Sequence, residues 1–302
     1  MNSLWYSITI LPFIMSEVIH TASGMIFDIE EFGIYDGPGI RCVIFMKGCP
    51  LRCRWCHNPE GLERRVQRMI ARERCRHCGE CERVCPSPGG CVACGACVRA
   101  CPGGLIELCG REVSSEQAAA RVRRISKLLI MNGGGITFSG GEALAQPEFV
   151  IETRRLLPEL HAAVETSGYV PSEVFHDVIR EIDLIMFDIK HTDPAAHKRW
   201  TGVDNARIRE NLELLKSSGK PFIARVPLIP GVNDTPENMT ETAKWVADAN
   251  GLIRVELLKY NKAAGAKYSR LGMDYSPGFD ESVEPNAFTQ PFTDKGIEVL
   301  VC

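Results

Sequence analysis

Alternating apolar runs and helical patterns in the second half of the chain predict strands that alternate with helices. Between the predicted strands, segments such as PEFVIETRRLL and PENMTETAKWVADA repeat apolar residues at helical spacing. Strands that alternate with helices call for a parallel sheet with right-handed crossovers. The strand-like runs lie at residues 135–140, 162–168, 184–190, 222–231 and 253–260.

Two more strands are predicted nearer the N-terminus. MIFDIEEF begins at residue 25, and the glycine-rich stretch GIYDGPGI leads into an apolar strand over residues 41–46. A helix is expected after Ser114, where S-S-E-Q forms a capping box ahead of AAARVRRISKLL. Counting the strand at 41–46, the chain has about six βα units, short of a closed eight-fold barrel. We therefore predict an α/β fold, a partial (β/α)6 TIM-like barrel.

Short polar motifs recur where the predicted strands end. These motifs are SGGE, ETSG, DIK and KYN. In parallel α/β folds, sites form at the carboxyl ends of the strands. We therefore expect these motifs to meet at one site.

The composition of the chain limits the classes of protein to which it can belong. The chain has 302 residues, 45% of them apolar, and a formal charge of −3. A formal charge this close to zero predicts no strongly positive surface that could bind nucleic acid. The apolar run LWYSITILPFI lacks a cationic start and is too short to span a bilayer. We therefore expect no membrane association and treat residues 1–24 as an N-terminal extension, for which a mis-assigned start is preferred over a signal peptide.

Fourteen cysteines are far more than usual for this length, and eleven lie in tight groups between Cys49 and Cys101. Disulfide frameworks space cysteines more widely, so clustered thiols indicate metal and a reducing cytoplasm. Between Cys75 and Cys101 the chain is rich in Cys, Gly and Pro and poor in large apolar residues. We predict a core domain at residues 25–302. It is interrupted at residues 66–108 by an insert that bound metal stabilises.

Cys49, Cys53 and Cys56 form a C-x3-C-x2-C triplet directly after a predicted strand. Three thiolates on a four-iron cluster leave one iron without a protein ligand, and an open metal position suits substrate chemistry. A reactive cluster is therefore the preferred interpretation. The alternatives are a zinc site completed by His57 and a four-Cys electron carrier that has lost a ligand.

The insert repeats C-x2-C-x2-C-x3-C-P, the bacterial ferredoxin pattern, in which the fourth cysteine ligates the other cluster. Two zinc knuckles are the alternative, although zinc has no use for the C-P ends. Only PSPGG separates the two quartets. The predicted ligands are Cys75, Cys78, Cys81 and Cys101 for one cluster, and Cys91, Cys94, Cys97 and Cys85 for the other.

The triplet, with an aromatic residue before its last cysteine, resembles the radical S-adenosylmethionine (SAM) enzymes. The wider window D-G-P-G-I-R-x3-F-x2-G-C-x3-C-x-W-C-x-N, which begins at Asp36, resembles the glycyl radical enzyme activating enzymes with a ferredoxin-type insert. The resemblance covers the chain from Met25 onward. It implies that SAM chelates the open iron, and that one electron cleaves it to methionine and a 5′-deoxyadenosyl radical.

The resemblance also implies roles for residues at the strand ends. The GGE motif would receive the SAM amino group, the D-x-K motif would contact the ribose and the methionine carboxylate, and Arg225 would pair with that carboxylate. Asn261 stands where some relatives have a histidine beside adenosine. The implied SAM contacts are Trp55, Cys56, His57, Ser139, Gly140, Gly141, Glu142, Asp188, Ile189, Lys190, Arg225 and Asn261.

Two further features are implied by the same resemblance. Relatives bind a monovalent cation where this chain has Glu165, Thr166, Met186 and Asp188. Asp36 and its DGPG loop would help to hold the partner's glycine-bearing loop, beside the ordinary role of glycine in a tight turn. We assign Asp36 with the cysteine triplet to catalysis.

The predicted function is activation of a partner glycyl radical enzyme. The deoxyadenosyl radical would take the α-hydrogen of one glycine, with a flavodoxin or ferredoxin as electron donor. Of three [4Fe–4S] clusters, one would bind SAM, and the two in the insert would relay electrons or stabilise docking. The C-terminal segment resembles activators of isethionate sulfite-lyase, which belongs to organosulfonate degradation. Activators of choline trimethylamine-lyase or 4-hydroxyproline dehydratase are alternatives, as are a radical SAM enzyme acting on a small molecule and a plain electron carrier fused to an inert barrel.

Overall fold

The computed structural model describes residues 21–87 and 90–302. The apolar N-terminal run lies outside these residues. Residues 23 and 24, assigned from sequence to the extension, already belong to the first strand, β1 (Ser23–Gly33). Within the described ranges, no helix is both long and apolar enough to cross a bilayer.

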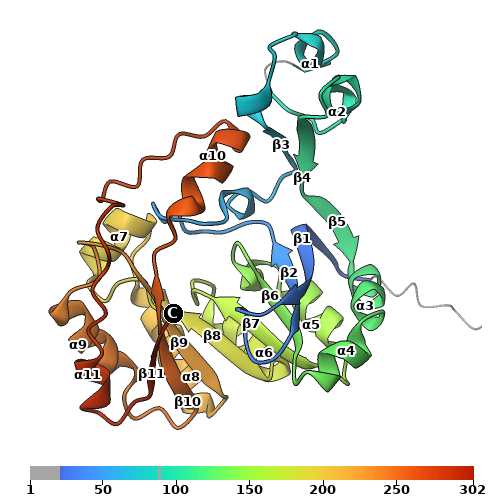
Figure 1. Ribbon diagram of the computed structural model, residues 1–302. Coiled ribbons are helices and arrows are strands. Elements are labelled where there is room, and N and C mark those ends of the chain that lie inside the picture. Colours follow the sequence, from blue (N-terminus) through green and yellow to red (C-terminus); the bar gives the residue numbers. More distant parts are fainter. Residues whose placement is uncertain (1–20, 88–89) are drawn as a thin grey trace, which may run out of the picture.

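One sheet forms the body of the protein (Figure 1). Its strand order is β11-β10-β9-β8-β7-β6-β2-β1-β5, parallel from β11 to β2, while β1 runs antiparallel to both β2 and β5. The predicted partial barrel is thereby confirmed. The bounds are β2 (Arg41–Met46), β5 (Arg111–Ser114), β6 (Gly135–Gly140), β7 (His161–Thr166), β8 (Leu184–Asp188), β9 (Phe222–Leu228), β10 (Leu252–Lys259) and β11 (Val299–Val301).

Helices cover the outer face of this sheet (Figure 1). The capping box predicted at Ser114 is present: its hydroxyl accepts from the backbone N–H of Gln117, whose side chain accepts from the N–H of Ser114. The helices are α3 (Ser115–Arg123), α4 (Ser126–Met131), α5 (Pro147–Arg155), α6 (Ser172–Glu181), α7 (Pro194–Thr201), α8 (Ala206–Ser218), α9 (Pro236–Val246) and α11 (Gln290–Thr293). A further helix, α10 (Gly265–Leu271), lies near the cysteine-rich insert.

The two faces of the strands have different surroundings. In β9, Phe222, Ala224 and Val226 join the large apolar core, as expected for side chains that alternate along a strand. Ile223 lies on the other face in a small apolar cluster. Arg225 follows on that inner face and pairs with two carboxylates. The barrel interior is therefore apolar at its base and charged above it.

The cysteine-rich insert extends from the barrel on a two-stranded stalk (Figure 1). The stalk pairs β3 (Gln67–Ile70) with β4 (Ile106–Cys109), and the insert holds α1 (Glu80–Arg83) and α2 (Ala96–Ala100). α10 braces it, because Arg270 pairs with Glu107 of the stalk at 2.6 Å. The boundaries 66–108 stay a prediction.

Candidate active site

The cysteine triplet lies on the loop that follows β2. Backbone hydrogen bonds hold this loop in place along its length. The N–H of Gly48 donates to the carbonyl of Gly61 at 2.7 Å, and the N–H of Cys49 donates to that of Leu62 at 3.1 Å. Further along, Arg52 and Arg54 donate their N–H groups to the last residues of α7, at 2.7 and 3.0 Å. The loop therefore has a defined path across the carboxyl edge of the sheet.

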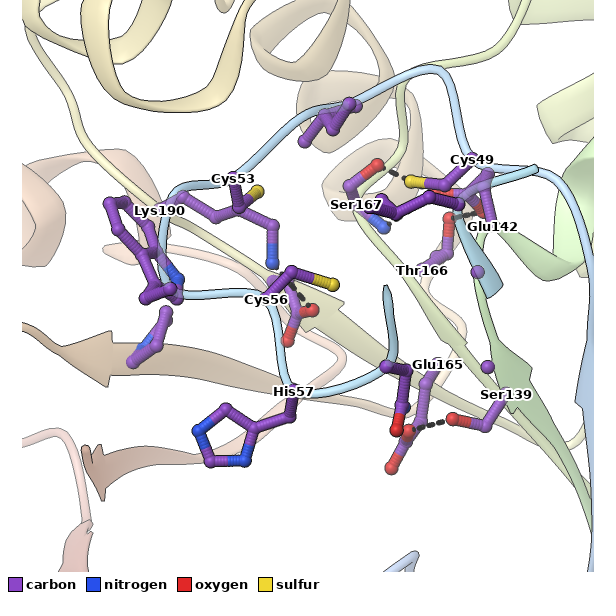
Figure 2. A pocket seen from close by; sticks show the side chains of 18 of the residues that line it. Cys49, Cys53, Cys56, His57, Ser139, Glu142, Glu165, Thr166, Ser167 and Lys190 are labelled. Carbon is purple, nitrogen blue, oxygen red and sulfur yellow. Dashed lines mark hydrogen bonds and ion pairs between the residues drawn. The ribbon is translucent and has the colours of Figure 1, made fainter. Parts of the chain in front are cut away.

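This loop and the strand ends enclose a cavity of about 220 Å³ (Figure 2). Side chains come to it from β6, β7 and β8, as expected for neighbouring parallel strands. Their contact with SAM stays a prediction. The predicted residues that line the cavity are Cys49, Cys53, Trp55, Cys56, His57, Ser139, Gly140, Gly141, Glu142, Asp188 and Lys190.

The three thiols border the cavity from one side (Figure 2). Burial raises the pKa of Cys53 to about 12, and it also raises the pKa of Cys49 and Cys56. In the described residues, no three His, Cys, Asp or Glu side chains gather closely enough to hold a metal ion. Three partly buried cysteines on one loop, beside a cavity lined by charged side chains, fit a cluster that keeps one position open to a cosubstrate.

Glu142 is the most strongly held carboxylate of the cavity wall, with 1% of its surface exposed. Its oxygens accept from the hydroxyls of Thr166 and Ser167 at 2.6 Å, and from the N–H groups of Ser167 and Leu144 at 2.9 and 3.2 Å. Burial raises the pKa of Glu142, and these four donors oppose that rise. The motif therefore holds a fixed acid beside Cys49.

Lys190 provides the positive charge of the cavity. Its Nζ lies 3.0 Å from Oδ2 of Asp188. Burial alone would lower the pKa of Lys190, but Asp188 and the nearby Cys53 outweigh burial and raise it. A cavity lined by an ammonium and by several carboxylates suits a zwitterionic ligand such as an amino acid.

Four predicted residues lie away from the cavity lining: Asp36, Ile189, Arg225 and Asn261. Ile189 packs into the large core, and Asn261 is exposed, with Oδ1 accepting from the N–H of Ala263 at 2.9 Å. Arg225 pairs with Glu165 and with Glu256 at 2.9 Å. Its third contact is the carbonyl of Tyr35, at 2.8 Å. The guanidinium is therefore fully engaged by protein groups.

Of the four residues expected at a cation site, three lie together in the structure. Glu165, Thr166 and Asp188 line the cavity, whereas Met186 packs in the small inner cluster. Glu165 also accepts from the hydroxyl of Ser139. A cation at this place stays a prediction.

Sequence reasoning placed the ETSG motif at the site without giving Ser167 a role, and it missed Glu256. Ser167 follows Thr166 in the ETSG motif and donates twice to Glu142. Glu256 is 5% exposed within the apolar run of β10. An acid between the apolar residues Val255 and Leu257 of a strand is a signal that could have identified it, because buried charges need partners.

Asp36 gives a prediction for the pH dependence of stability. Burial, and secondly Glu165, raise its pKa from 3.8 to about 6, while Arg225 and Arg41 oppose the rise. The protonated acid is favoured on folding, so this stabilisation is complete below pH 3.8 and is lost as the pH rises through 6. As the pH rises from 4 to 7, the free energy of unfolding of Asp36→Asn should therefore increase by about 1 kcal/mol relative to that of the parent, allowing for solvent screening. Thermal melts across this range measure the difference.

The exposed Asp274→Asn supplies the control for that series. If the melting temperatures of Asp36→Asn and the parent differed by the same amount at every pH, the prediction would be contradicted.

Gly141 sits where the GGE turn meets the cysteine loop. A Cβ there would lie 2.5 Å from the carbonyl oxygens of both Gly48 and Gly61. Neither carbonyl can move freely, because Gly48 accepts from the N–H of Glu142 at 2.9 Å and Gly61 accepts from the N–H of Gly48. Gly141→Ala should lower the free energy of unfolding by about 1–3 kcal/mol, measured by denaturant titration.

Gly90→Ala is the matched control, because a Cβ at Gly90 meets nothing within 4 Å. Equal effects of the two substitutions would show that the contact at Gly141 is not restrictive.

The barrel and the cysteine loop at its carboxyl edge define a class of protein. A family model described as the radical SAM superfamily matches residues 43–246. This superfamily implies a [4Fe–4S] cluster and SAM, which the thiols and the charged cavity fit.

Three relatives of known function indicate the group within the radical SAM superfamily to which this chain is similar. The (2S)-3-sulfopropanediol dehydratase activating enzyme of Klebsiella oxytoca is 37% identical, over 83% of this chain and 86% of its own length. The choline trimethylamine-lyase activating enzyme of Oleidesulfovibrio alaskensis is 35% identical, over 83% and 88%. The isethionate sulfite-lyase activating enzyme of the same organism is 36% identical, over 82% and 87%. The chain belongs to the glycyl radical enzyme activating enzymes, and the family resemblance found in the sequence is confirmed.

Proposed function

We propose that this protein activates a glycyl radical enzyme by reductive cleavage of SAM, and that its partner is isethionate sulfite-lyase. The observation that carries the proposal is the cavity bordered by three thiols on one side and by Lys190, Asp188 and Glu142 elsewhere. When bound there, a cluster and SAM together supply a radical that can abstract a hydrogen atom from carbon. In net terms, one electron, one SAM and one glycine give methionine, 5′-deoxyadenosine and a glycyl radical.

The protein's own residues bind and orient SAM in this proposal. The ammonium of Lys190 attracts the methionine carboxylate, Asp188 accepts from the ribose, and the GGE motif with Glu142 receives the amino group. Trp55 and His57 border the adenine side. Trp55 is held by Trp200, with ring centroids 6.4 Å apart, and His57 meets the edge of Tyr260 at 5.8 Å. These contacts fix the rings without using their polar atoms.

The insert would hold two more [4Fe–4S] clusters and receive electrons from a flavodoxin or ferredoxin. Cys85, Cys91, Cys94 and Cys97 line one cavity of about 400 Å³, which supports the crossed pairing expected from ferredoxins. The other set is Cys75, Cys78, Cys81 and Cys101. Cys81 and Cys101 pack against the same small apolar cluster, which also contains Cys97 of the first set.

The choice of partner rests on the C-terminal segment and on relatives named for sulfonate substrates. Choline trimethylamine-lyase and 4-hydroxyproline dehydratase are the competing partners. The residues of the cavity do not distinguish among them, because the activating enzyme acts on the partner's glycine and never meets the partner's substrate.

Anaerobic reconstitution tests the proposal. The holoenzyme is mixed with SAM, dithionite and each purified candidate partner, and glycyl radical formation is followed by electron paramagnetic resonance. We expect the doublet with isethionate sulfite-lyase. A doublet only with choline trimethylamine-lyase or 4-hydroxyproline dehydratase would reassign the partner. Deoxyadenosine formation without a radical in any of them would reject activation of these enzymes.

A further inference from the structure

A second cavity lies beside the cysteine loop, between β1, β2, the stalk and α10. Its volume is about 390 Å³, and its polar lining includes Glu60 and Lys267. Neither of these residues lines the active-site cavity, but Asn58 lines both cavities. Asn58 follows the proposed cluster ligand Cys56 by two residues. Charges in the second cavity are therefore placed next to the cysteine loop without contacting SAM.

Glu60 is the most buried acid of this second cavity. It is 6% exposed, and its Oε2 has no hydrogen-bond partner among the described residues. Glu60 lies in the 3₁₀ turn η1 (Pro59–Gly61), where the carbonyl of Gly61 accepts from the N–H of Gly48. A buried carboxylate with an unpartnered oxygen depends on a cation for its stability.

Lys267 of α10 supplies that cation. Its Nζ lies 2.7 Å from Oε1 of Glu60 and 3.2 Å from Oδ1 of Asn58. The buried Lys47 is also at this turn, but its Nζ donates to the backbone carbonyl of Glu60 and to the side chain of Gln67. The ammonium of Lys267 therefore both neutralises the buried carboxylate and holds the segment that follows Cys56.

This pair of charges bears on how easily a cluster on the cysteine triplet accepts an electron. Reduction adds one negative charge to a cluster, so a nearby cation favours the reduced form and an unpaired anion disfavours it. The side chain of Glu60 is only 8% exposed, so water screens its charge weakly. Without Lys267, the carboxylate of Glu60 would oppose reduction.

We propose that Lys267 is a positioning residue for the cysteine loop, and that by neutralising Glu60 it raises the reduction potential of the cluster held by the triplet. This inference rests on the proposed function, which takes Cys49, Cys53 and Cys56 as the ligands of that cluster. Lys267 acts through Glu60 and Asn58. The alternative is that Lys267 only fastens α10 to the barrel.

Redox titrations of the reconstituted holoenzyme, followed by electron paramagnetic resonance without any partner, test the proposal. The signal of the triplet cluster is the one that changes when SAM is added, because only a cluster with an open iron position can bind SAM. In Lys267→Met, the equilibrium constant for reduction of that cluster should fall about tenfold, which is 59 mV for one electron.

Two further variants separate charge from geometry. Lys267→Arg keeps the cation and should keep the potential of the parent. The double variant of Lys267→Met and Glu60→Gln removes both charges, so its potential should return most of the way to that of the parent. A double variant as low as Lys267→Met would overturn the proposal, because lost loop geometry would then be the cause.

Arg270→Met is the matched control. Arg270 also lies on α10, is 39% exposed against 43% for Lys267, and pairs with an acid at 2.6 Å. That acid, Glu107, is 57% exposed, so water screens its charge once the cation is removed. We expect the reduction equilibrium of Arg270→Met to stay within about 2-fold of the parent.

Three other results would overturn the proposal. One is a fall of less than about 2-fold in Lys267→Met, and another is an equal fall in Arg270→Met. The third is that no signal of the parent responds to SAM. In that case the proposed function itself fails, and this inference fails with it, whereas the first two results leave the proposed function intact.

Discussion

Replacing Cys53 by alanine is expected to lower the rate of SAM cleavage by more than about 100-fold. Loss of residues that merely orient metal ligands already costs about 10–100-fold in metal affinity or activity, and Cys53 is itself a proposed ligand. Cys53 lies at the middle of the loop, beside Lys190 on the cavity wall. The measurements are deoxyadenosine formation under dithionite and the iron content of the reconstituted protein.

The iron content distinguishes loss of one cluster from collapse of the protein. Iron should fall by about four atoms per chain while the two insert clusters remain, if each cluster holds four irons. Cys302→Ser is the control, since Cys302 is an exposed thiol outside every proposed cluster. Full SAM cleavage by Cys53→Ala would exclude the cysteine triplet as the cluster site.

The main strands could be located from sequence because each is a buried run bounded by polar residues. The strand expected at 41–46 is β2 at those same residues, and the one at 135–140 is β6. Four short strands were missed: β5 and β11 at the edges of the main sheet, and β3 and β4 of the stalk. Each has only three or four residues, so none gives a clear alternation of apolar and polar positions.

The lining of the active-site cavity could be predicted where residues follow a strand's carboxyl end, since parallel strands bring those ends to one edge. Arg225 shows the limit of that reasoning. It lies inside β9, where its lateral neighbours are Asp188 of β8 and Glu256 of β10. Which charge faces which across a sheet depends on strand register, and the sequence of a single strand does not contain that information.

Replacing Arg225 by methionine is therefore expected to act first on stability. Arg225 keeps its charge despite burial, because Glu165 and Glu256 outweigh the burial that would lower its pKa. Removing one partner of a buried ion pair leaves an uncompensated charge and costs about 3–5 kcal/mol. Denaturant titration of Arg225→Met should give a loss of free energy of unfolding of that size, because Glu165 loses its cation and Glu256 keeps only Arg254, at 2.6 Å.

A matched exposed pair provides the comparison that makes this result specific. Arg83 pairs with Glu80 at 2.6 Å, but its side chain is 71% exposed, and exposed pairs contribute little because water and salt screen them. Arg83→Met should therefore leave stability unchanged. If Arg225→Met were instead as stable as the parent and only its affinity for SAM fell, Arg225 would have the carboxylate-binding role expected from the sequence. The ion-pair network would then not be what requires an arginine at this position.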